Sequence, residues 1–583
     1  MGSSQANNDL ERVDLEAVGL HQDGNNQNEE KARNAEVDEP TPPAKRGRQF
    51  WAIMVALQLS TLIVACETNV AATALPSIMA DLGFMGSFDW VLNAYNLMST
   101  AVQPPVGQFS DIFGRKPVIM GGLILYMLGS VLCGAADSAN MLVAGRAVQG
   151  AGGGIMLVLA ELIVSDVVPL NERSSFFGAI MGISALGLII GPFIGGFVTS
   201  RWSWRWIYYL NVPVGLIALA MLQFCLTMQH RRDPDWRKNM AKIEYVGVTL
   251  ITLGTIGVLI GFSSSEIKLV PLVIGCVGLI LFAIHQNSSL CRIPLMPKRL
   301  FNVATSLAFM INFLLAVIQI ALPYFFAVFL EALLDHSPER SGADLVPLFL
   351  TFLPVAAITG GIISKTGRYR FSHIGSMTCL SIAMAGSMRL NGQTPTYVWT
   401  ILLCIASIGI GFAVPSLLPA AQAPLPDSDS AAVTATFSFI RSLGFVWGVF
   451  GTTILFNHKV DREVFKVKDS AVAKLLENGG AYSRATAEFM KSLTESTRFQ
   501  VASLYSSSLK TVFQGLFALA LVGLVLSLME KHIIMRKTLD EKAGFGLAKN
   551  PRVETEDNEE GKYWEDDTTE SVSLTEIPSG LNL

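Results

Sequence analysis

The chain has 583 residues, of which 51% are hydrophobic and only 15% are charged, and its formal net charge is -4 at pH 7. This apolar share indicates an integral membrane protein and argues against a soluble globular one. The basic residues lie in short clusters between apolar runs and form no single patch or stripe, so we expect no nucleic-acid partner.

Residues 1–49 are polar, contain no apolar stretch and end in Lys45, Arg46 and Arg48. A cleavable signal peptide needs an apolar core, so none is expected, and the first membrane helix must direct insertion. We predict a disordered cytoplasmic amino-terminal tail and, in the acidic residues 536–583, a second one at the carboxyl terminus.

Apolar windows of about 20 residues, the length that spans ~30 Å of hydrocarbon, recur along the chain and predict about fourteen transmembrane helices. They begin near Trp51, Trp90, Val118, Leu142, Phe177, Ile207, Val246, Leu269, Thr305, Leu345, Phe371, Val398, Thr434 and Val512. Lys and Arg gather in alternate short loops, which are retained on the cytoplasmic side, so both termini are predicted to be cytoplasmic.

The windows predict an all-α membrane protein with two six-helix bundles, residues 50–230 and 301–535. Two additional central helices are expected between them, within residues 231–300. Residues 457–508 of the second bundle are long for a loop and mix charged with apolar residues. We interpret them as a partly helical cap on the outer side.

The sequence GQFSDIFGRK lies between the second and third apolar windows. Gly107 has no side chain and would let another helix approach closely, while Asp111 can accept hydrogen bonds from backbone amides at a helix start. Gly114 follows, and Arg115 with Lys116 holds this turn in the cytoplasm. An ordinary basic loop would explain the two cations but not the glycines that flank the aspartate.

A related sequence, GGIISKTGRYR, begins at Gly360. Gly360 and Gly367 repeat the spacing of the two glycines in the first copy, Arg368 takes the place of the arginine, and Ser364 replaces the aspartate. Chance similarity of two short basic turns is the alternative. Homologous halves are what a rocking transporter needs, because two similar bundles can tilt about a central site.

The first of these sequences resembles the signature loop between the second and third helices of the major facilitator superfamily. In the fourth-helix sequence LVAGRAVQGAGGG the matching residues are Arg146, Gln149 and Gly150, and in the fifth-helix sequence GLIIGPFIGG they are Gly187, Gly191, Pro192, Gly195 and Gly196. CETNVAATALP resembles the first helix of the fourteen-span drug:proton antiporter family, with Glu67 for a usual aspartate and Asn69 for a usual threonine. WRWIYYLNVPVG resembles the sixth-helix entry of that family. The resemblance implies a major facilitator fold and assigns the fifth-helix glycines to a hinge between bundles; a plain packing face is the alternative.

Glu67 and Arg146 are the candidate proton-coupling residues. At 1.5 Å per residue Glu67 is ~24 Å from the cytoplasmic start of its helix, and Arg146 is ~9 Å from the outer start of its own. Both would lie in the outer half, where each charge makes the other more tolerable. The competing interpretation is a purely structural ion pair. Glu161 and Arg441 are weaker candidates, because both are expected near the inner end where hydration or snorkelling is cheap.

The resemblance implies that helices one, four, nine and twelve line a substrate cavity. Candidate cavity residues are Asn69, Asn312, Gln319, Tyr324 and Phe325. An apolar pocket with a few amide groups suits amphipathic or aromatic molecules, but the same residues also serve helix packing and interface anchoring.

Seven cysteines lie in or beside apolar segments without a CxxC pair or a histidine cluster, so neither disulfides nor a metal site is expected. The sequence shows no pattern of nucleophile and base, and no GxxxxGK[ST] loop for ATP. We therefore expect no enzymatic activity, no catalytic residue and no cofactor, with a proton gradient as the driving force.

The resemblance, which is strongest to fungal toxin and drug exporters, predicts a proton-coupled efflux antiporter for amphipathic or aromatic small molecules that works by alternating access. The expected partners are a small-molecule substrate, protons and the lipid bilayer, and the resemblance implies a monomer in the plasma membrane, with the vacuolar membrane as the alternative. Two other functions stay open. One is a carrier of a defined substrate such as a basic amino acid or a siderophore, and the other is a membrane sensor that transports nothing.

Overall fold

The computed structural model describes residues 47–82, 88–226, 240–262, 268–289, 291, 293–477, 479–531, 533 and 535. Apart from residues 47–49, both predicted tails lie outside the described residues. The chain separates into two units, Met1–Trp51 and Ala52–Leu583. The first contributes only the start of helix α2 to the described part, and every contact below lies within the second.

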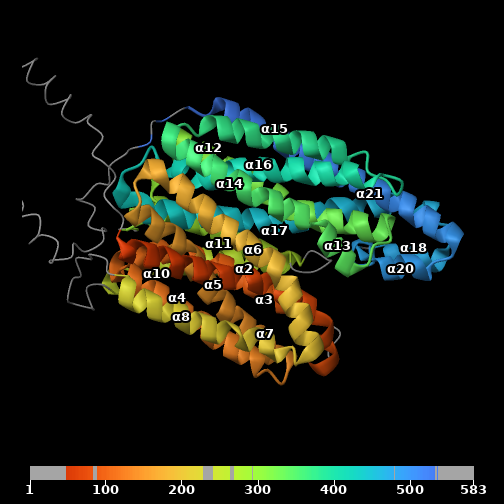
Figure 1. Cartoon of the computed structure of the whole chain (residues 1–583), viewed down its shortest axis with the longest axis horizontal. Helices are drawn as coiled ribbons and strands as arrows, with labels where there is room; N and C mark the ends of the chain where they lie inside the picture. Colours follow the sequence, from red (N-terminus) through yellow and green to blue (C-terminus); the bar gives the residue numbers. More distant parts are fainter. Residues whose placement is uncertain are drawn as a thin grey trace, which may run out of the picture. The chain divides into compact units, whose positions relative to one another are not determined.

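The amino-terminal half of the second unit consists of helices packed around α5. The helices are α2 (Arg48–Leu82), α3 (Phe88–Phe113), α4 (Arg115–Gly134), α5 (Ala139–Val167), α6 (Leu170–Arg201), α7 (Arg205–Tyr209) and α8 (Asn211–Cys225) (Figure 1). Both α3 and α4 pack along α5, and α8 packs along α4. A Cβ atom on Gly152 would lie 2.4 Å from the backbone nitrogen of Tyr126, so the glycine-rich α5 approaches α4 at backbone distance.

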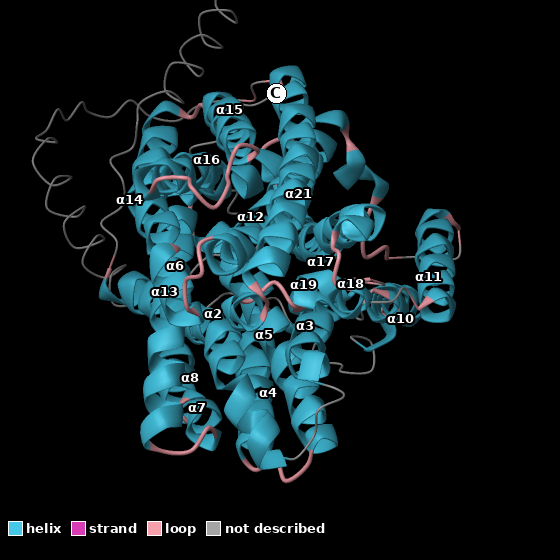
Figure 2. Ribbon diagram, turned by 90° about the vertical axis from the view of Figure 1, so that its right-hand side faces the viewer, coloured by secondary structure: helices cyan, strands magenta, loops and turns pink. Residues whose placement is uncertain are grey.

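Two helices follow this half, α10 (Tyr245–Gly261) and α11 (Leu269–Asn287). They lie side by side (Figure 2), and a Cβ atom on Gly257 would lie 2.8 Å from the Cα atom of Gly275. α10 also packs against α3. Along α11, Leu269, Val270 and Ile274 are at least 65% exposed, and an apolar helix face without protein cover suits contact with lipid.

The carboxyl-terminal half is packed around α12. Its elements are η1 (Lys298–Phe301), α12 (Val303–Val328), η2 (Phe329–Leu333), α13 (Pro338–Asp344), α14 (Val346–Thr366), α15 (Arg370–Ser387), α16 (Thr396–Gln422), η3 (Asp427–Asp429), α17 (Ser430–Glu463), η4 (Val464–Lys466), α18 (Ser470–Leu476), α19 (Gly480–Ser483), α20 (Ala487–Ser492) and α21 (Glu495–Met529). The two halves meet most extensively along α6 with α14 and α3 with α17, and α16 with α6 and α17 with α5 add further contact.

Helix is the regular structure of this fold, and the described residues contain no strand, which confirms the predicted all-α class. Within these residues, ten helical stretches are long and apolar enough to cross a membrane, and α10 is a shorter apolar helix. The chain is therefore a multi-pass membrane protein. The number of fourteen spans stays a prediction, as do the domain boundaries.

The predicted cap, residues 457–508, is helical for most of its length. α17 continues to Glu463 and α21 begins at Glu495, so the flanking helices take up both ends of the expected loop, and α18, α19 and α20 lie between them. The apolar windows ended too early because a helix can continue with charged side chains once it has left the hydrocarbon region.

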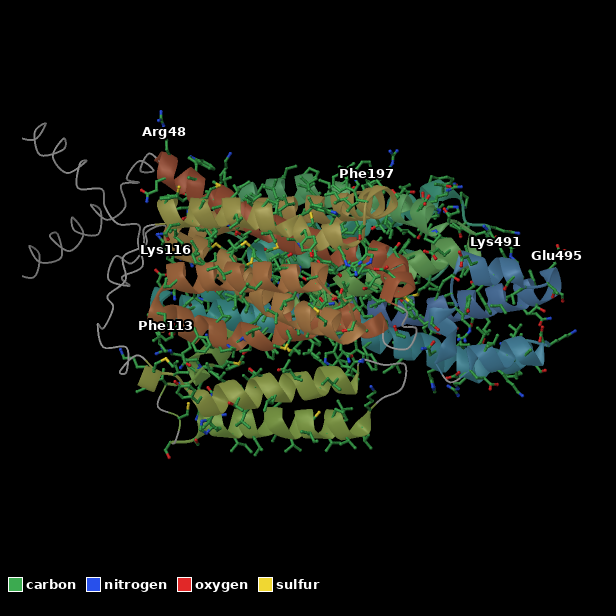
Figure 3. The ribbon with its side chains drawn as sticks, turned by 90° about the horizontal axis from the view of Figure 1, so that it is seen from below. Arg48, Phe113, Lys116, Phe197, Lys491 and Glu495 are labelled. Carbon is green, nitrogen blue, oxygen red and sulfur yellow. The ribbon has the colours of Figure 1, made fainter. Side chains whose placement is uncertain are left out.

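The two ends of the helices can be told apart by labelled residues. Phe113 and Lys116 lie at one end, here called the inner end, whereas Lys491 and Glu495 lie at the opposite, outer end (Figure 3). By the distribution of basic residues the inner end is predicted to be cytoplasmic.

Candidate functional site

The centre of the candidate site is an ion pair between Glu67 on α2 and Arg146 on α5. Nη1 of Arg146 lies 2.6 Å from Oε1 of Glu67, and both side chains are 1% exposed. The second carboxylate oxygen, Oε2, accepts a hydrogen bond of 2.6 Å from the Asn211 amide on α8. Both oxygens of a buried carboxylate are thus occupied by donors, which is the condition for keeping such a charge inside a protein.

Further groups hold the guanidinium of Arg146 in place. Nε donates to the carbonyl oxygen of Val91 on α3 at 2.9 Å, and Nη1 also donates to Oε1 of Gln149 at 2.8 Å. The Gln149 amide in turn donates to the Ser130 hydroxyl on α4 at 2.9 Å. The ring of Tyr95 lies under the guanidinium, with its centroid 4.6 Å from Cζ, so the cation is enclosed on its face as well as at its edges.

The ends of several helices converge to build this site. Arg146 lies in the second turn of α5, Val91 near the start of α3 and Asn211 at the first residue of α8, all toward the outer end. The depth calculation from the sequence placed Glu67 and Arg146 in the same half, and the structure brings them into contact. Sequence reasoning missed Asn211 and Tyr95, because no spacing rule connects positions on α8 and α3 with α2.

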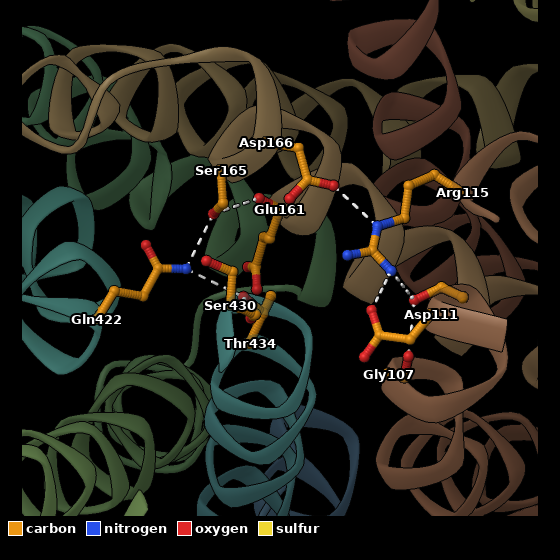
Figure 4. Close-up of polar contacts among 10 residues, drawn as sticks. Gly107, Asp111, Arg115, Glu161, Ser165, Asp166, Gln422, Ser430 and Thr434 are labelled. Carbon is orange, nitrogen blue, oxygen red and sulfur yellow. Dashed lines mark hydrogen bonds and ion pairs between the residues drawn. The ribbon is translucent and has the colours of Figure 1, made fainter. Parts of the chain in front are cut away.

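The turn between α3 and α4 is held by Arg115, whose side chain is 2% exposed. Nη1 of Arg115 lies 2.6 Å from Oδ1 of Asp111, and Nε lies 2.8 Å from Oδ2 of Asp166 at the end of α5 (Figure 4). Lys116 donates to the carbonyl oxygen of Gln223 at 2.6 Å. Asp111 lies in the last turn of α3, which continues to Phe113, just before α4 begins at Arg115, and its role as an acceptor for amides at a helix start stays a prediction.

The internal repeat is visible in the structure as two equivalent contacts between the halves. A Cβ atom on Gly107 would lie 2.9 Å from the carbonyl oxygen of Ala431 on α17, and one on Gly360 would lie 2.6 Å from that of Ser174 on α6. The second glycine of each copy has a positive φ, 91° at Gly114 and 66° at Gly367. The close helix approach predicted at Gly107 is thus confirmed, and its counterpart at Gly360 does the same on the other helix pair.

Polar contacts between the halves gather toward the inner end, and we call the set formed by Glu161, Ser165, Arg441, Ser438, Gln422 and Arg173 the inner gate. Arg441 of α17 lies 2.7 Å from Glu161 of α5, and the Ser438 hydroxyl donates to the same carboxylate at 2.7 Å. Glu161 is only 2% exposed. The sequence indicates a hydrated helix end for Glu161, and this prediction was wrong. The depth calculation considered α5 alone, whereas α17 of the other half covers Glu161.

Gln422 of α16 forms the second part of the inner gate. Its amide donates to the Ser165 hydroxyl of α5 at 2.9 Å, as Figure 4 shows, and its Oε1 accepts from Arg173 of α6 at 2.7 Å. A single amide therefore joins two helices of one half to the other. Loss of this contact would leave Arg173, which is 1% exposed, without one of its acceptors.

The fifth-helix glycines fall on α6, which is continuous from Leu170 to Arg201. Gly187 faces α2, where an added Cβ would lie 3.1 Å from the Cβ atom of Ala65, while a Cβ on Gly196 would meet nothing within 4 Å. Gly191 and Gly195 are buried, and the side chain of Pro192 lies outside the described part. The contact of α6 with the other half uses Gly178 and Gly182 instead, so the hinge role of the motif stays a prediction.

The cavity candidates are placed as follows. Asn312 is buried and donates to the carbonyl oxygen of Phe437 at 3.0 Å, so it joins α12 to α17. Phe325 is fully buried, with its ring centroid 5.6 Å from that of Tyr482, because α19 covers this end of α12. Gln319 is partly exposed and Tyr324 is 44% exposed, and their place in a substrate cavity stays a prediction. The side chain of Asn69 lies outside the described part.

Comparison with known proteins gives a consistent assignment. A family profile described as Major Facilitator Superfamily matches residues 57–449. The chain is 39% identical over 534 residues to the MFS efflux transporter aclA of Aspergillus oryzae, covering 88% of this chain and 97% of the relative. It is 37% identical over 517 residues to the MFS-type transporter gkaD of Penicillium citrinum, with 87% and 88% covered. It is 35% identical over 535 residues to the efflux pump FUS6 of Gibberella fujikuroi, with 90% and 96% covered.

Among solved structures, the chain resembles the proton:xylose symporter XylE bound to 6-bromo-6-deoxy-D-glucose, with a TM-score of 0.51 at 12% identity over 76% of this chain and 95% of the other. It also resembles the human organic anion transporter MFSD10, with a TM-score of 0.55 at 13% identity over 83% and 100%. At these identities the likeness concerns the fold alone, and it confirms the predicted fold class.

Proposed function

Because the chain belongs to the major facilitator superfamily, and is therefore a membrane transporter of small molecules and not an enzyme, we propose that it exports its substrate in exchange for protons. The observation that carries the proposal is the buried carboxylate of Glu67 with a donor on each oxygen. The relatives named as efflux transporters support the direction of transport.

The chemistry of Glu67 makes proton binding a switch. An ionised carboxylate only accepts hydrogen bonds, whereas a protonated one must also donate. Arg146 has no acceptor atom, so a proton on Oε1 must point away from it, and the present ion pair becomes a weaker hydrogen bond to a neutral carboxyl group. A proton on Oε2 can be accommodated if the Asn211 side chain rotates and presents its carbonyl oxygen. Protonation therefore loosens the link between α2 and α5 or re-orients Asn211 on α8.

Helix α5 connects this switch to the inner gate. Glu161 follows Arg146 by fifteen residues on the same helix, which corresponds to ~22 Å at 1.5 Å per residue. The inner end is closed by Glu161, Arg441 and Gln422, so transport requires that these contacts break while the halves tilt. A rigid α5 that responds to the charge of Glu67 would transmit the proton's presence to the gate.

The wider assignment follows from the same premise. The two six-helix bundles are residues 50–230 and 301–535, joined by residues 231–300, and we place the protein in the plasma membrane as a monomer with the inner end in the cytoplasm. Amphipathic or aromatic molecules such as toxins or secondary metabolites are the proposed substrates. Protons are the coupling ion, and no cofactor takes part.

The test measures accumulation of dyes, antifungals and mycotoxins in pump-deficient yeast that express the wild-type chain or Glu67→Gln. Lower accumulation with the wild type alone, reversed by a protonophore, is the expected result, since glutamine keeps the shape of the side chain but cannot bind the proton. Glu495→Gln, which changes an exposed carboxylate at the outer end, is the matched control and should transport normally.

Two results would count against the proposal. Uphill efflux by Glu67→Gln at the wild-type rate would remove Glu67 as the proton site. No difference across the panel with surface expression confirmed would favour a narrow substrate, such as an amino acid or a siderophore, or a sensor, and substrate-dependent proton movement in proteoliposomes would separate those two.

A further inference from the structure

The structure brings three metal-binding side chains together where the sequence predicted no metal site. They are Glu244 before α10, His285 in the last turn of α11 and Cys291 shortly after it, and one ligand atom of each lies within 4.8 Å of the other two. Cys291 follows His285 by six residues, but Glu244 is 41 residues away in sequence, so no local motif announces the cluster. We propose that these residues form a zinc-binding site at the inner end of the α10–α11 pair.

The donor set selects the class of metal. Thiolate and imidazole are ligands of zinc and related transition metals, whereas magnesium and calcium take oxygen ligands alone. In a tetrahedral zinc site with bonds of about 2.0–2.3 Å, the ligand atoms are roughly 3.3–3.7 Å apart. The Glu244 and His285 atoms lie 2.6 Å apart and all three ligand atoms lie within 4.8 Å of one another, so shifts of about 1 Å reach that spacing, and three protein ligands leave a fourth position for water or for a group from a partner.

Glu244 and His285 are already aligned for such an ion. Nε2 of His285 lies 2.6 Å from Oε1 of Glu244, so a metal would replace the proton between these two atoms and move them apart by roughly 0.8 Å. Binding requires Nε2 without its proton and Cys291 as thiolate, so protons are released as the zinc enters. No electron is transferred in this step.

The surrounding contacts hold the ligands as outer partners do in metal sites. Gln286 donates to Oε2 of Glu244 at 2.8 Å, and its Oε1 accepts from the backbone of Met296 at 3.3 Å. Glu244 also accepts from the backbone amide of Gly247 at 2.7 Å as the cap of α10. Such outer contacts fix ligand orientation and are worth 10–100-fold in metal affinity. Without a metal, Glu244 would serve to cap α10 and to pair with His285. This alternative explains these two residues but gives no role to the thiol of Cys291.

The position of the site gives it a means of regulation. The Gln108 side chain accepts from the backbone amide of Glu244 at 3.2 Å and donates to the carbonyl oxygen of Ile293 at 3.3 Å. Gln108 follows Gly107, where α3 touches α17. Zinc would connect Glu244 with the segment of Cys291 and Ile293, the two segments that Gln108 contacts. It would thereby fix the α10–α11 pair to the end of α3 that meets the opposite half.

The experiment is a zinc-binding measurement on the full chain in lipid nanodiscs, which does not depend on transport. After equilibrium dialysis against zinc, the wild type should retain one zinc per chain, and with cobalt it should show a thiolate-to-metal charge-transfer band. Cys291→Ser should lose the band, and both Cys291→Ser and His285→Gln should bind at least ~10-fold more weakly. Cys276→Ser, which changes an exposed cysteine on α11 outside the cluster, should bind as the wild type does.

The proposal is overturned if the wild type binds no stoichiometric zinc, or if Cys291→Ser keeps both the affinity and the cobalt band. Variants are compared only when their size-exclusion profiles match that of the wild type, and Glu244→Gln, which retains an oxygen to cap α10, supplies a third ligand change. Since the readout is metal content, the result is independent of proton coupling.

Discussion

Replacement of Gly360 by alanine should open the inner end, and the structure allows the effect to be sized. The added Cβ would lie 2.6 Å from the carbonyl oxygen of Ser174 and 2.9 Å from the Cα atom of Ser175, where 3.4 Å or more is ordinary contact. Because both neighbours are backbone atoms of α6, the two helices must move apart by roughly 0.8 Å. Overpacking of this kind costs ~1–3 kcal/mol, which corresponds to a ~5–150-fold shift away from the closed inner end.

The neighbouring Gly361 provides the control, because a Cβ atom there would meet nothing within 4 Å. A cysteine in place of Ser438, which is fully buried in the inner gate, reports opening through its rate of alkylation by a polar maleimide. Gly360→Ala should raise that rate by ~5–150-fold while Gly361→Ala leaves it unchanged. Equal rates in the two backgrounds, with both proteins folded, would show that the close contact between α6 and α14 does not control the gate.

Three further changes test other parts of the fold. Arg441→Ala leaves Glu161 buried without its cation, at a cost of ~3–5 kcal/mol, and the double variant with Glu161→Gln should recover thermal stability; no recovery would refute the pairing. Asp81 lies beyond the candidate membrane span of α2, and a hydrogen bond from Arg205 lowers the pKa of its carboxyl group below the ordinary 3.8. The contact is therefore fully present above pH 3.8 and is lost as the pH falls through the lowered pKa. Unfolding of the wild type and Asp81→Asn should therefore differ by a constant amount from about pH 7 to 5 and converge in stronger acid. Gly187→Leu should separate α6 from α2 and reduce transport at normal surface expression.

Much of the fold was predictable because hydrophobic length is a strong signal. Windows of about 20 apolar residues located the long helices, and basic loops gave an orientation. The ends of the helices were less predictable. For example, α21 begins at Glu495, well before the start of the apolar window near Val512. Apolar windows detect hydrocarbon contact, whereas backbone hydrogen bonding determines where a helix ends.

The candidate site was predictable only in part. Glu67 and Arg146 stood out because they lie in sequences that resemble the family's first and fourth helices and because a charge deep in a membrane helix needs a partner, and the depth calculation placed both in the outer half. Asn211 and Tyr95 complete the site from other helices, and only three-dimensional packing brings them there. Glu161 was undervalued for the same reason, because its burial comes from the opposite half.

The repeat explains how one change in tilt can affect both contact surfaces together. Gly107 places α3 against α17, and Gly360 places α14 against α6, so each half contributes one glycine helix to the other's surface. Both contacts have backbone atoms at their centre, and a side-chain hydrogen bond crosses beside each of them, Ser175 with Ser364 at 2.7 Å and Ser442 with Gln103 at 3.0 Å. The contacts that resist separation therefore include these two bonds together with the ion pair and the amide links of the inner gate. The proposed proton coupling requires that Glu67 act on a helix that reaches the inner gate, and α5, with Arg146 near one end and Glu161 near the other, has that property.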